Sequence, residues 1–174
     1  MFRTSIRLAA VALIAFASVA QAQRPVFGVA AGLTAPQGDF GDGVDNGYHV
    51  GAAVGFKVPV LPVALRADLA YTTFGTKDPI DGNVNTLNLS VNAVHAFPGV
   101  AIRPYVIGGL GMYRTSGSGD LEDMESSTDM GLNGGAGIQF KLAGVQSFVE
   151  ARYTHIMTED EATTVIPISF GIMF

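Results

Sequence analysis

The sequence of 174 residues contains no cysteine and no tryptophan, and charged residues make up only 14% of it. Without cysteine the chain has no disulfide framework, no thiolate nucleophile and no thiolate metal ligand. Soluble domains usually contain about 25% charged residues, so the low value indicates that much of the surface faces a solvent other than water. The net charge of −5 argues against nucleic acid as a partner.

The chain also lacks an apolar run long enough for a transmembrane helix, which needs about 20 residues. The run from Leu8 to Ala20 has 13 residues and follows two arginines. A basic start, a short apolar core and the small residues of "AQA" at the end of this run are typical of a cleaved secretory signal. We therefore expect residues 1–22 to be a signal peptide for export through the Sec pathway, and residues 23–174 to form a single domain.

The exported part of the chain does show a clear alternation with a period of two. In "VALRADLAYTTF", which begins at Val63, large apolar residues alternate with small or polar ones. Successive side chains of a strand point to opposite faces, so the pattern predicts a strand with one apolar and one polar face. It recurs in eight segments of about 9–12 residues, the length with which a tilted strand crosses a bilayer. These segments begin at Val26, Gly47, Val63, Asn85, Ile102, Asp129, Val145 and Thr164.

The connections between the segments also alternate. Three are short and nearly uncharged, around "PVLP", "FPGVA" and "LAGV", and four are longer and polar. Transmembrane barrels show this asymmetry between periplasmic turns and extracellular loops, but a soluble cup with an apolar interior shares the strand pattern. The polar face carries few charges and many glycines, unlike a water-facing surface, and this favours the membrane. The fold class expected is all-β, an eight-stranded antiparallel up-and-down transmembrane β-barrel.

Four charged residues lie on the polar faces of the predicted strands. Arg66 and Asp68 are two residues apart on one strand, and Glu150 and Arg152 are two residues apart on another. Because the polar face of a membrane barrel turns inward, we expect these four to form a charge network that plugs the lumen. On the outward face, phenylalanines are expected at the inner rim and tyrosines at the outer rim. These residues are Phe27, Phe56, Phe140 and Phe174, and Tyr48, Tyr71 and Tyr153.

Of the 15 acidic residues, 13 fall in the four longer loops or at their edges. Solvated loops, divalent cations bound by oxygen ligands, and recognition of another surface each explain such a distribution. The spacing does not match an EF-hand loop, which needs a glutamate at its twelfth position, and residues 159–161 add three acids to the last loop. The candidates for cation or surface binding are Asp39, Asp42, Asp45, Asp120, Glu122, Asp123 and Glu125.

With its eight alternating strands, signal peptide, acidic loops and final "IPISFGIMF", the chain resembles the small outer-membrane β-barrel family, including the outer membrane protein A and X types and the opacity-type adhesins. The resemblance implies that Phe170, Ile172 and Phe174 form the signal read by the barrel assembly machinery. It also implies a location in the cell outer membrane of a Gram-negative-type bacterium, in contact with outer-membrane lipid and lipopolysaccharide.

Some small outer-membrane barrels modify lipids, and such enzymes need a hydroxyl nucleophile or a histidine at the outer rim. The nearest candidate is His155, but the pattern of a lipid A deacylase has a serine two residues later, and that position is Met157. We therefore expect no enzyme activity, no metal site and no cofactor. The expected function is a monomeric barrel with a structural or adhesin-like role that presents its loops to an extracellular or host ligand. The alternative is a narrow, porin-like channel for small solutes.

Overall fold

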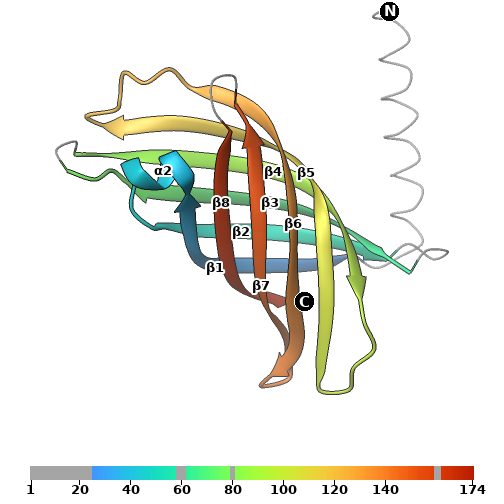
Figure 1. Cartoon of the computed structure of the whole chain (residues 1–174). Helices are drawn as coiled ribbons and strands as arrows, with labels where there is room; N and C mark the ends of the chain where they lie inside the picture. Colours follow the sequence, from blue (N-terminus) through green and yellow to red (C-terminus); the bar gives the residue numbers. More distant parts are fainter. Residues whose placement is uncertain (1–24, 58–61, 79–80, 159–161) are drawn as a thin grey trace, which may run out of the picture.

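The computed structural model describes residues 25–57, 62–78, 81–158 and 162–174. Eight antiparallel strands form a closed barrel in which each strand pairs with its sequence neighbours and the first pairs with the last (Figure 1). The predicted fold class is therefore confirmed. The strands are β1 (Val26–Gln37), β2 (Gly47–Lys57), β3 (Ala64–Gly75), β4 (Gly82–Ala96), β5 (Ile102–Gly119), β6 (Ser127–Leu142), β7 (Val145–Met157) and β8 (Thr163–Met173).

Three predicted features fall wholly or largely outside the described residues: the signal peptide, the "PVLP" turn and the acids at 159–161. Within the ranges given above, no helix is long and apolar enough to cross a bilayer. The β6–β7 connection is the tight turn predicted at "LAGV". Its two central residues, Ala143 and Gly144, have φ values of 50° and 84°. Positive φ at both positions is the requirement of a type I′ turn, which suits the twist of a hairpin.

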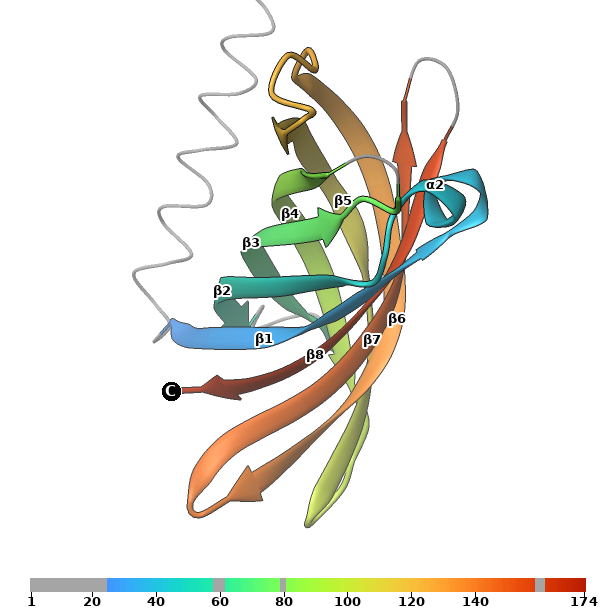
Figure 2. The same ribbon diagram turned by 90° about the vertical axis from the view of Figure 1, so that its left-hand side faces the viewer.

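Several strands are longer than the predicted 9–12 residues. β4 has 15 residues, β5 has 18 and β6 has 16. The predicted strands that begin at Ile102 and Asp129 left too long a loop between them, since the connection spans only residues 120–126. Beyond the bilayer both faces of a strand meet water, so the apolar alternation stops there although the backbone ladder continues. Figure 1 shows the outer ends of β4 and β5 extending past α2, and in Figure 2 this end of the barrel faces the viewer.

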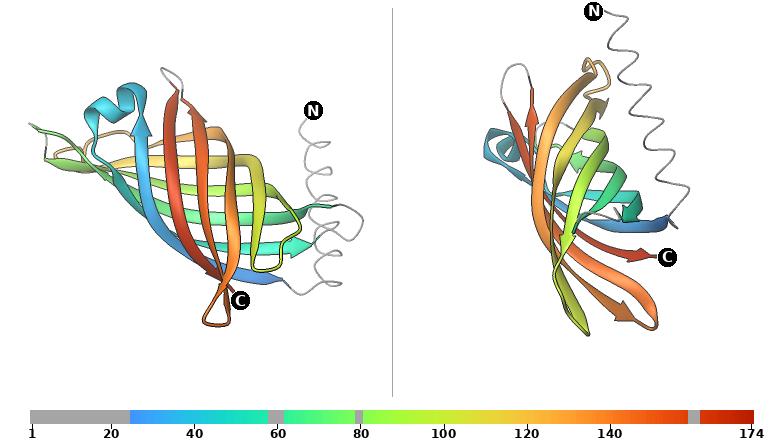
Figure 3. Two further views of the ribbon diagram at one scale, coloured as in Figure 1. Left: turned by 60° about the horizontal axis from the view of Figure 1, so that its bottom comes forward. Right: turned by 90° about the vertical axis from the view of Figure 1, so that its right-hand side faces the viewer.

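The first polar loop was predicted without secondary structure but contains a short helix, α2 (Gly38–Gly43). It lies at the end of the barrel opposite the C-terminus (Figures 1 and 3). Two contacts tie it to the loop between β3 and β4. The backbone N–H of Lys77 donates to the carbonyl oxygen of Gly43 at 3.1 Å, and its Nζ donates to that of Gly41 at 2.7 Å. The two loops therefore form one structure at the mouth.

Large apolar side chains cover the outside of the barrel and polar ones are buried inside it, the reverse of a soluble protein. Side chains on the outward register, such as Leu33, Leu89 and Leu132, are more than half exposed, whereas Asn92 and Glu150 are buried inside. This distribution suits lipid outside, so the structure supports the membrane barrel over the soluble cup. The predicted rim residues that are exposed are Phe27, Tyr48, Tyr71, Tyr153 and Phe174, while Phe56 and Phe140 are half-buried.

The lumen is less uniformly polar than predicted, because apolar clusters lie toward both of its ends. Near the loops, Val44, Phe74, Val84 and Val165 pack together, with Phe40 of α2 and Leu121 against them. At the opposite end a second cluster contains Val94, Tyr105, Ile107 and Phe148. Burial of each such apolar side chain contributes about 1.5–3 kcal/mol to folding. The charged middle of the lumen thus lies between two apolar clusters.

Candidate functional site

The four charges predicted for the lumen come together at its centre. Arg66 on β3 donates through Nη2 to both carboxylate oxygens of Glu150 on β7, at 2.8 and 2.9 Å. Arg66 Nε lies 3.0 Å from Asp68 Oδ1, Arg152 Nε lies 2.6 Å from Glu150 Oε1, and Arg152 Nη2 lies 3.3 Å from Asp68 Oδ2. In the closed strand order, three strands separate β3 from β7 in either direction. The network therefore spans the full width of the lumen.

Neutral polar side chains complete this charge network. The Tyr105 hydroxyl donates to Glu150 Oε2 at 2.7 Å, and Asn92 Nδ2 donates to Asp68 Oδ2 at 2.6 Å. Gly137 on β6 lies between Tyr105 and Glu150 in the register, and a Cβ there would stand 2.5 Å from Tyr105 Cζ. Glycine thus lets the tyrosine reach across β6. The sequence placed Tyr105 and Asn92 on the inward face but did not indicate that they contact the charges.

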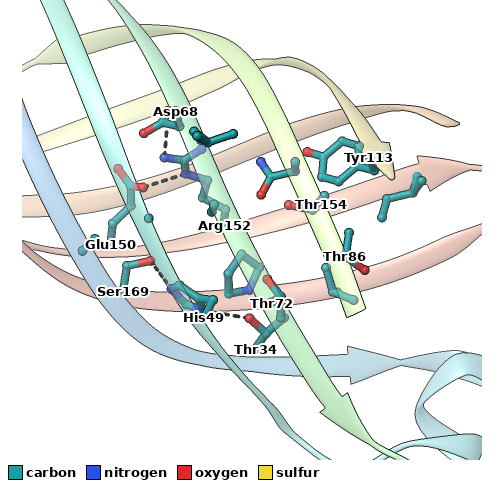
Figure 4. Close-up of a pocket in the computed structure, with 18 of the residues that line it drawn as sticks. Thr34, His49, Asp68, Thr72, Thr86, Tyr113, Glu150, Arg152, Thr154 and Ser169 are labelled. Atoms are coloured by element: carbon teal, nitrogen blue, oxygen red, sulfur yellow. Dashed lines mark hydrogen bonds and ion pairs between the residues drawn. The ribbon is translucent and has the colours of Figure 1, made fainter. Parts of the chain in front are cut away.

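A cavity of about 180 Å³ lies in the lumen, bordered by the charge network and by Phe40 and Phe74 of the apolar cluster near the loops. Most of its lining is apolar, but the hydroxyl groups of Thr72, Thr86, Tyr113 and Thr154 (Figure 4) and the amide of Asn88 also face it. The space is large enough to hold several water molecules, which these polar groups could contact. The two arginines and two carboxylates of the network balance each other, so the cavity has no net charge with which to select an ion.

His49 links three adjacent strands beside this cavity. Its Nδ1 lies 2.9 Å from Thr34 Oγ1 on β1, and its Nε2 lies 2.9 Å from Ser169 Oγ on β8 (Figure 4). A hydroxyl next to an imidazole is the contact between nucleophile and base in a hydrolase. Here, however, the third group is the neutral hydroxyl of Thr34 rather than a carboxylate. The arrangement therefore resembles a cross-strand tie more than a catalytic triad.

The family model of the outer membrane protein β-barrel domain matches residues 8–174. The chain belongs to this family. Outer-membrane barrels of similar fold include Neisserial surface protein A, with 15% identity over 86% of this chain and 95% of that one, at a TM-score of 0.67. A major outer membrane protein of Thermus thermophilus has 14% identity over 87% and 100% of the two chains, at a TM-score of 0.59.

The outer membrane enzyme PagL has 19% identity over 86% of this chain and 98% of that one, at a TM-score of 0.60. No curated protein sequence matches the chain significantly. Likeness at such low identity shows a shared fold alone, and relatives with this fold include both an enzyme and a surface protein. The protein is thus an outer-membrane β-barrel protein, and the bacterial outer membrane is its location.

The acids predicted for cation or surface binding sit on the loops of this outer-membrane barrel. Asp39 and Asp42 lie on α2 and Asp45 just after it, all exposed, while Asp120, Glu122, Asp123 and Glu125 occupy the exposed β5–β6 connection. Asp120 Oδ2 accepts a hydrogen bond from the backbone N–H of Asp81 at 3.2 Å. Among the described residues, no three aspartate, glutamate or histidine side chains gather in a way that could hold a metal ion.

The remaining predicted residues lie on the outward register. Phe170 and Phe174 are 46% and 69% exposed, and Ile172 is half-buried. His155 Nδ1 lies 3.3 Å from Thr164 Oγ1, and His95 Nδ1 lies 2.7 Å from the backbone oxygen of Pro62. Neither imidazole forms a hydrogen bond or ion pair with a carboxylate in the described part of the chain.

Proposed function

We propose that this outer-membrane barrel is a sealed, monomeric protein with a structural or adhesin-like role, and that its outer loops carry the interaction. One observation carries the proposal: paired charges cross the whole lumen, and apolar clusters lie toward both of its ends. The interior of an eight-stranded barrel is just wide enough to be filled by side chains or to hold one small ligand. A lumen filled in this way supports presentation of loops rather than passage of solutes.

The loops offer a mainly acidic surface. Seven exposed acids lie on α2, just after it and on the β5–β6 connection, so a partner with a basic surface would be steered toward them. Neisserial surface protein A, which shares the fold, bears a name that places it at the cell surface. The partner proposed is an extracellular or host ligand with a cationic patch.

Conductance across a planar lipid bilayer tests the sealed lumen. The refolded protein should give no discrete current steps at either polarity, because no continuous water path crosses the charge network. The variant Glu150→Ala, which removes the carboxylate contacted by both arginines, should admit small, noisy currents. Regular steps from the unaltered protein would refute the proposal.

A narrow channel for small solutes is the second candidate, and the cavity of about 180 Å³ in the lumen favours it. In that case the charge network would have to open without unfolding of the barrel. Regular single-channel steps with a fixed conductance in the same experiment would establish this function.

We infer that the protein is not an enzyme, although the similar barrel PagL is one. His155 contacts a threonine hydroxyl, and His49 lies within the lumen beneath the outer apolar cluster. Incubation of the protein with lipopolysaccharide should leave the mass spectrum of its lipid portion unchanged, and a new acylated or deacylated species would show catalysis.

We also infer that residues 1–22 direct export and that Phe170, Ile172 and Phe174 are read by the barrel assembly machinery. The exposed outward position of Phe170 supports this, since its replacement leaves the lumen packing intact. Phe170→Ser should lower the folded fraction in the outer membrane more than Phe27→Ser, a matched change on β1. Equal effects would remove the assembly role.

A further inference from the structure

Among the described residues of the eight strands, Arg114 on β5 is the only charged residue (Asp, Glu, Lys or Arg) on the outward register. Burial alternates along β5, with Tyr113 buried and Met112 and Arg114 exposed. The other charged strand residues occupy the inward register. They are Lys57, Arg66, Asp68, Arg103, Asp129, Lys141, Glu150 and Arg152. A charged side chain on a lipid-facing surface is costly and usually marks a functional contact.

The surroundings of Arg114 change from apolar to polar at its own position. In the register it pairs with Leu87 on β4 and with Thr128 on β6. Toward the middle of the membrane, its outward neighbours Met112 and Met130 are more than half exposed. Toward the loops, the outward side chains are polar but uncharged. These are Asn83, Asn85, Ser116, Ser118 and Thr128, and Asn85 Nδ2 donates to Ser118 Oγ at 3.0 Å.

Nothing in the described part of the chain neutralises the Arg114 guanidinium. All ion pairs found there belong to the lumen network. Asp129 is on the inward face, where it accepts a hydrogen bond from Ser127, and Asp81 and Asp120 lie beyond the last paired row of β4 and β5. The outward neighbours of Arg114 are uncharged. Its charge is therefore left to the solvent or lipid outside the barrel.

We propose that Arg114 and the polar side chains above it bind the phosphorylated sugar headgroup of a glycolipid in the outer leaflet. A guanidinium presents a planar fork of donors that fits a phosphate with two parallel hydrogen bonds. Asparagine, serine and threonine supply donors and acceptors suited to sugar hydroxyls. The boundary between apolar and polar side chains is the level at which lipid headgroups lie. The site thus has three parts: apolar side chains that face the acyl chains, Arg114 that contacts the phosphate, and polar side chains that face the sugar.

Two features favour a lipid headgroup over a free phosphate ion. The apolar side chains on one side of Arg114 suit acyl chains, and the long polar surface on the other side exceeds the size of a phosphate. This contact also differs from non-specific anchoring of an arginine at the membrane surface. Such anchoring needs only the positive charge of the side chain and does not depend on a phosphate group of the lipid. This inference is independent of whether the barrel conducts, since it concerns the outer wall alone.

Native mass spectrometry of the protein in micelles of a phosphate-free, sugar-free polyoxyethylene detergent tests the site. The probes are lipid A with its two phosphates and the same lipid A after removal of both. The unaltered protein should retain the phosphorylated form, and Arg114→Gln should bind it at least about tenfold more weakly, the factor expected for losing charge-assisted hydrogen bonds. Arg114→Lys should fall between the two, since it keeps the charge but loses the fork.

The matched control is Arg103→Gln, because Arg103 is an exposed arginine on the same strand but near its other end and on the inward register. It should bind lipid A like the unaltered protein. The heat-induced gel shift of Arg114→Gln should match that of the unaltered protein, since the substitution leaves the lumen intact.

Three results would overturn the proposal: full retention of phosphorylated lipid A by Arg114→Gln, an equal loss in Arg103→Gln, or equally tight binding of the dephosphorylated lipid. Displacement of the lipid by millimolar inorganic phosphate would overturn the assignment to a lipid and indicate a free-anion site.

Discussion

Glu150 is the most connected charge of the lumen. It accepts hydrogen bonds from Arg66, Arg152 and Tyr105, and its side chain is only 2% exposed. Glu150→Gln should destabilise the barrel by about 3–5 kcal/mol, because two buried guanidinium groups would then share the single carboxylate of Asp68. Urea unfolding in lipid vesicles measures this change.

The matched control is Glu122→Gln on the exposed β5–β6 connection, where the same change of charge should alter stability by less than about 0.5 kcal/mol. The double variant Arg66→Gln with Glu150→Gln should lose less stability than the sum of the single changes, because the buried charges balance again. Additive losses would mean that the two residues do not act as a pair.

The positions of the four network charges could be predicted, whereas their hydrogen-bond partners could not. Alternation fixes the face of a strand on which a residue lies, so Arg66, Asp68, Glu150 and Arg152 could be assigned to the lumen. Contacts across the lumen also depend on the stagger between strands, which alternation does not encode. The contact of Tyr105 with Glu150 depends further on the missing side chain of Gly137.

At the scale of elements, the strands were predictable only where lipid lies on one side of them. The outer part of β5, from Thr115 to Gly119, consists of small and polar residues and was predicted as loop. α2 was missed because its six residues include three glycines and have no side-chain cap. Its position depends on contacts with the neighbouring loop, which are absent from the local sequence pattern.

Phe40 of α2 lines the cavity in the lumen on its outer side. Its ring packs edge-on against Phe74 with 5.3 Å between centroids. Because the native chain has no cysteine, a single cysteine introduced at Thr86, on the cavity wall, reports access from water. In this background Phe40→Ala should speed the reaction with a water-soluble thiol reagent about 2- to 10-fold, given the strength of an aromatic pair.

Phe97→Ala is the control for this measurement, since Phe97 is an exposed phenylalanine on the connection between β4 and β5. It should leave the rate of labelling unchanged. An unchanged rate in Phe40→Ala would show that α2 does not control access to the cavity.

At the scale of the whole molecule, charge is divided along the barrel axis. Exposed acids such as Glu122 and Glu125 lie at the end with the longer loops, and the exposed cations Arg103 and Lys141 lie toward the other end. On intact cells a glutamate-specific protease should cut at Glu122 or Glu125, because the longer loops of such barrels face outward. Trypsin should cut after Lys141 only once the outer membrane is permeabilised. The reverse pattern would invert the orientation.

The position of the charge network on opposite walls has a consequence for folding kinetics. Arg66 and Glu150 are 84 residues apart and meet across the lumen, so their contact requires a sheet that has already closed between β1 and β8. Interactions that form after the transition state change the unfolding rate and not the folding rate. Glu150→Gln should therefore unfold faster in vesicles while it folds at nearly the same rate. The network then determines how long the barrel persists, whereas the strand ladder determines how fast it forms.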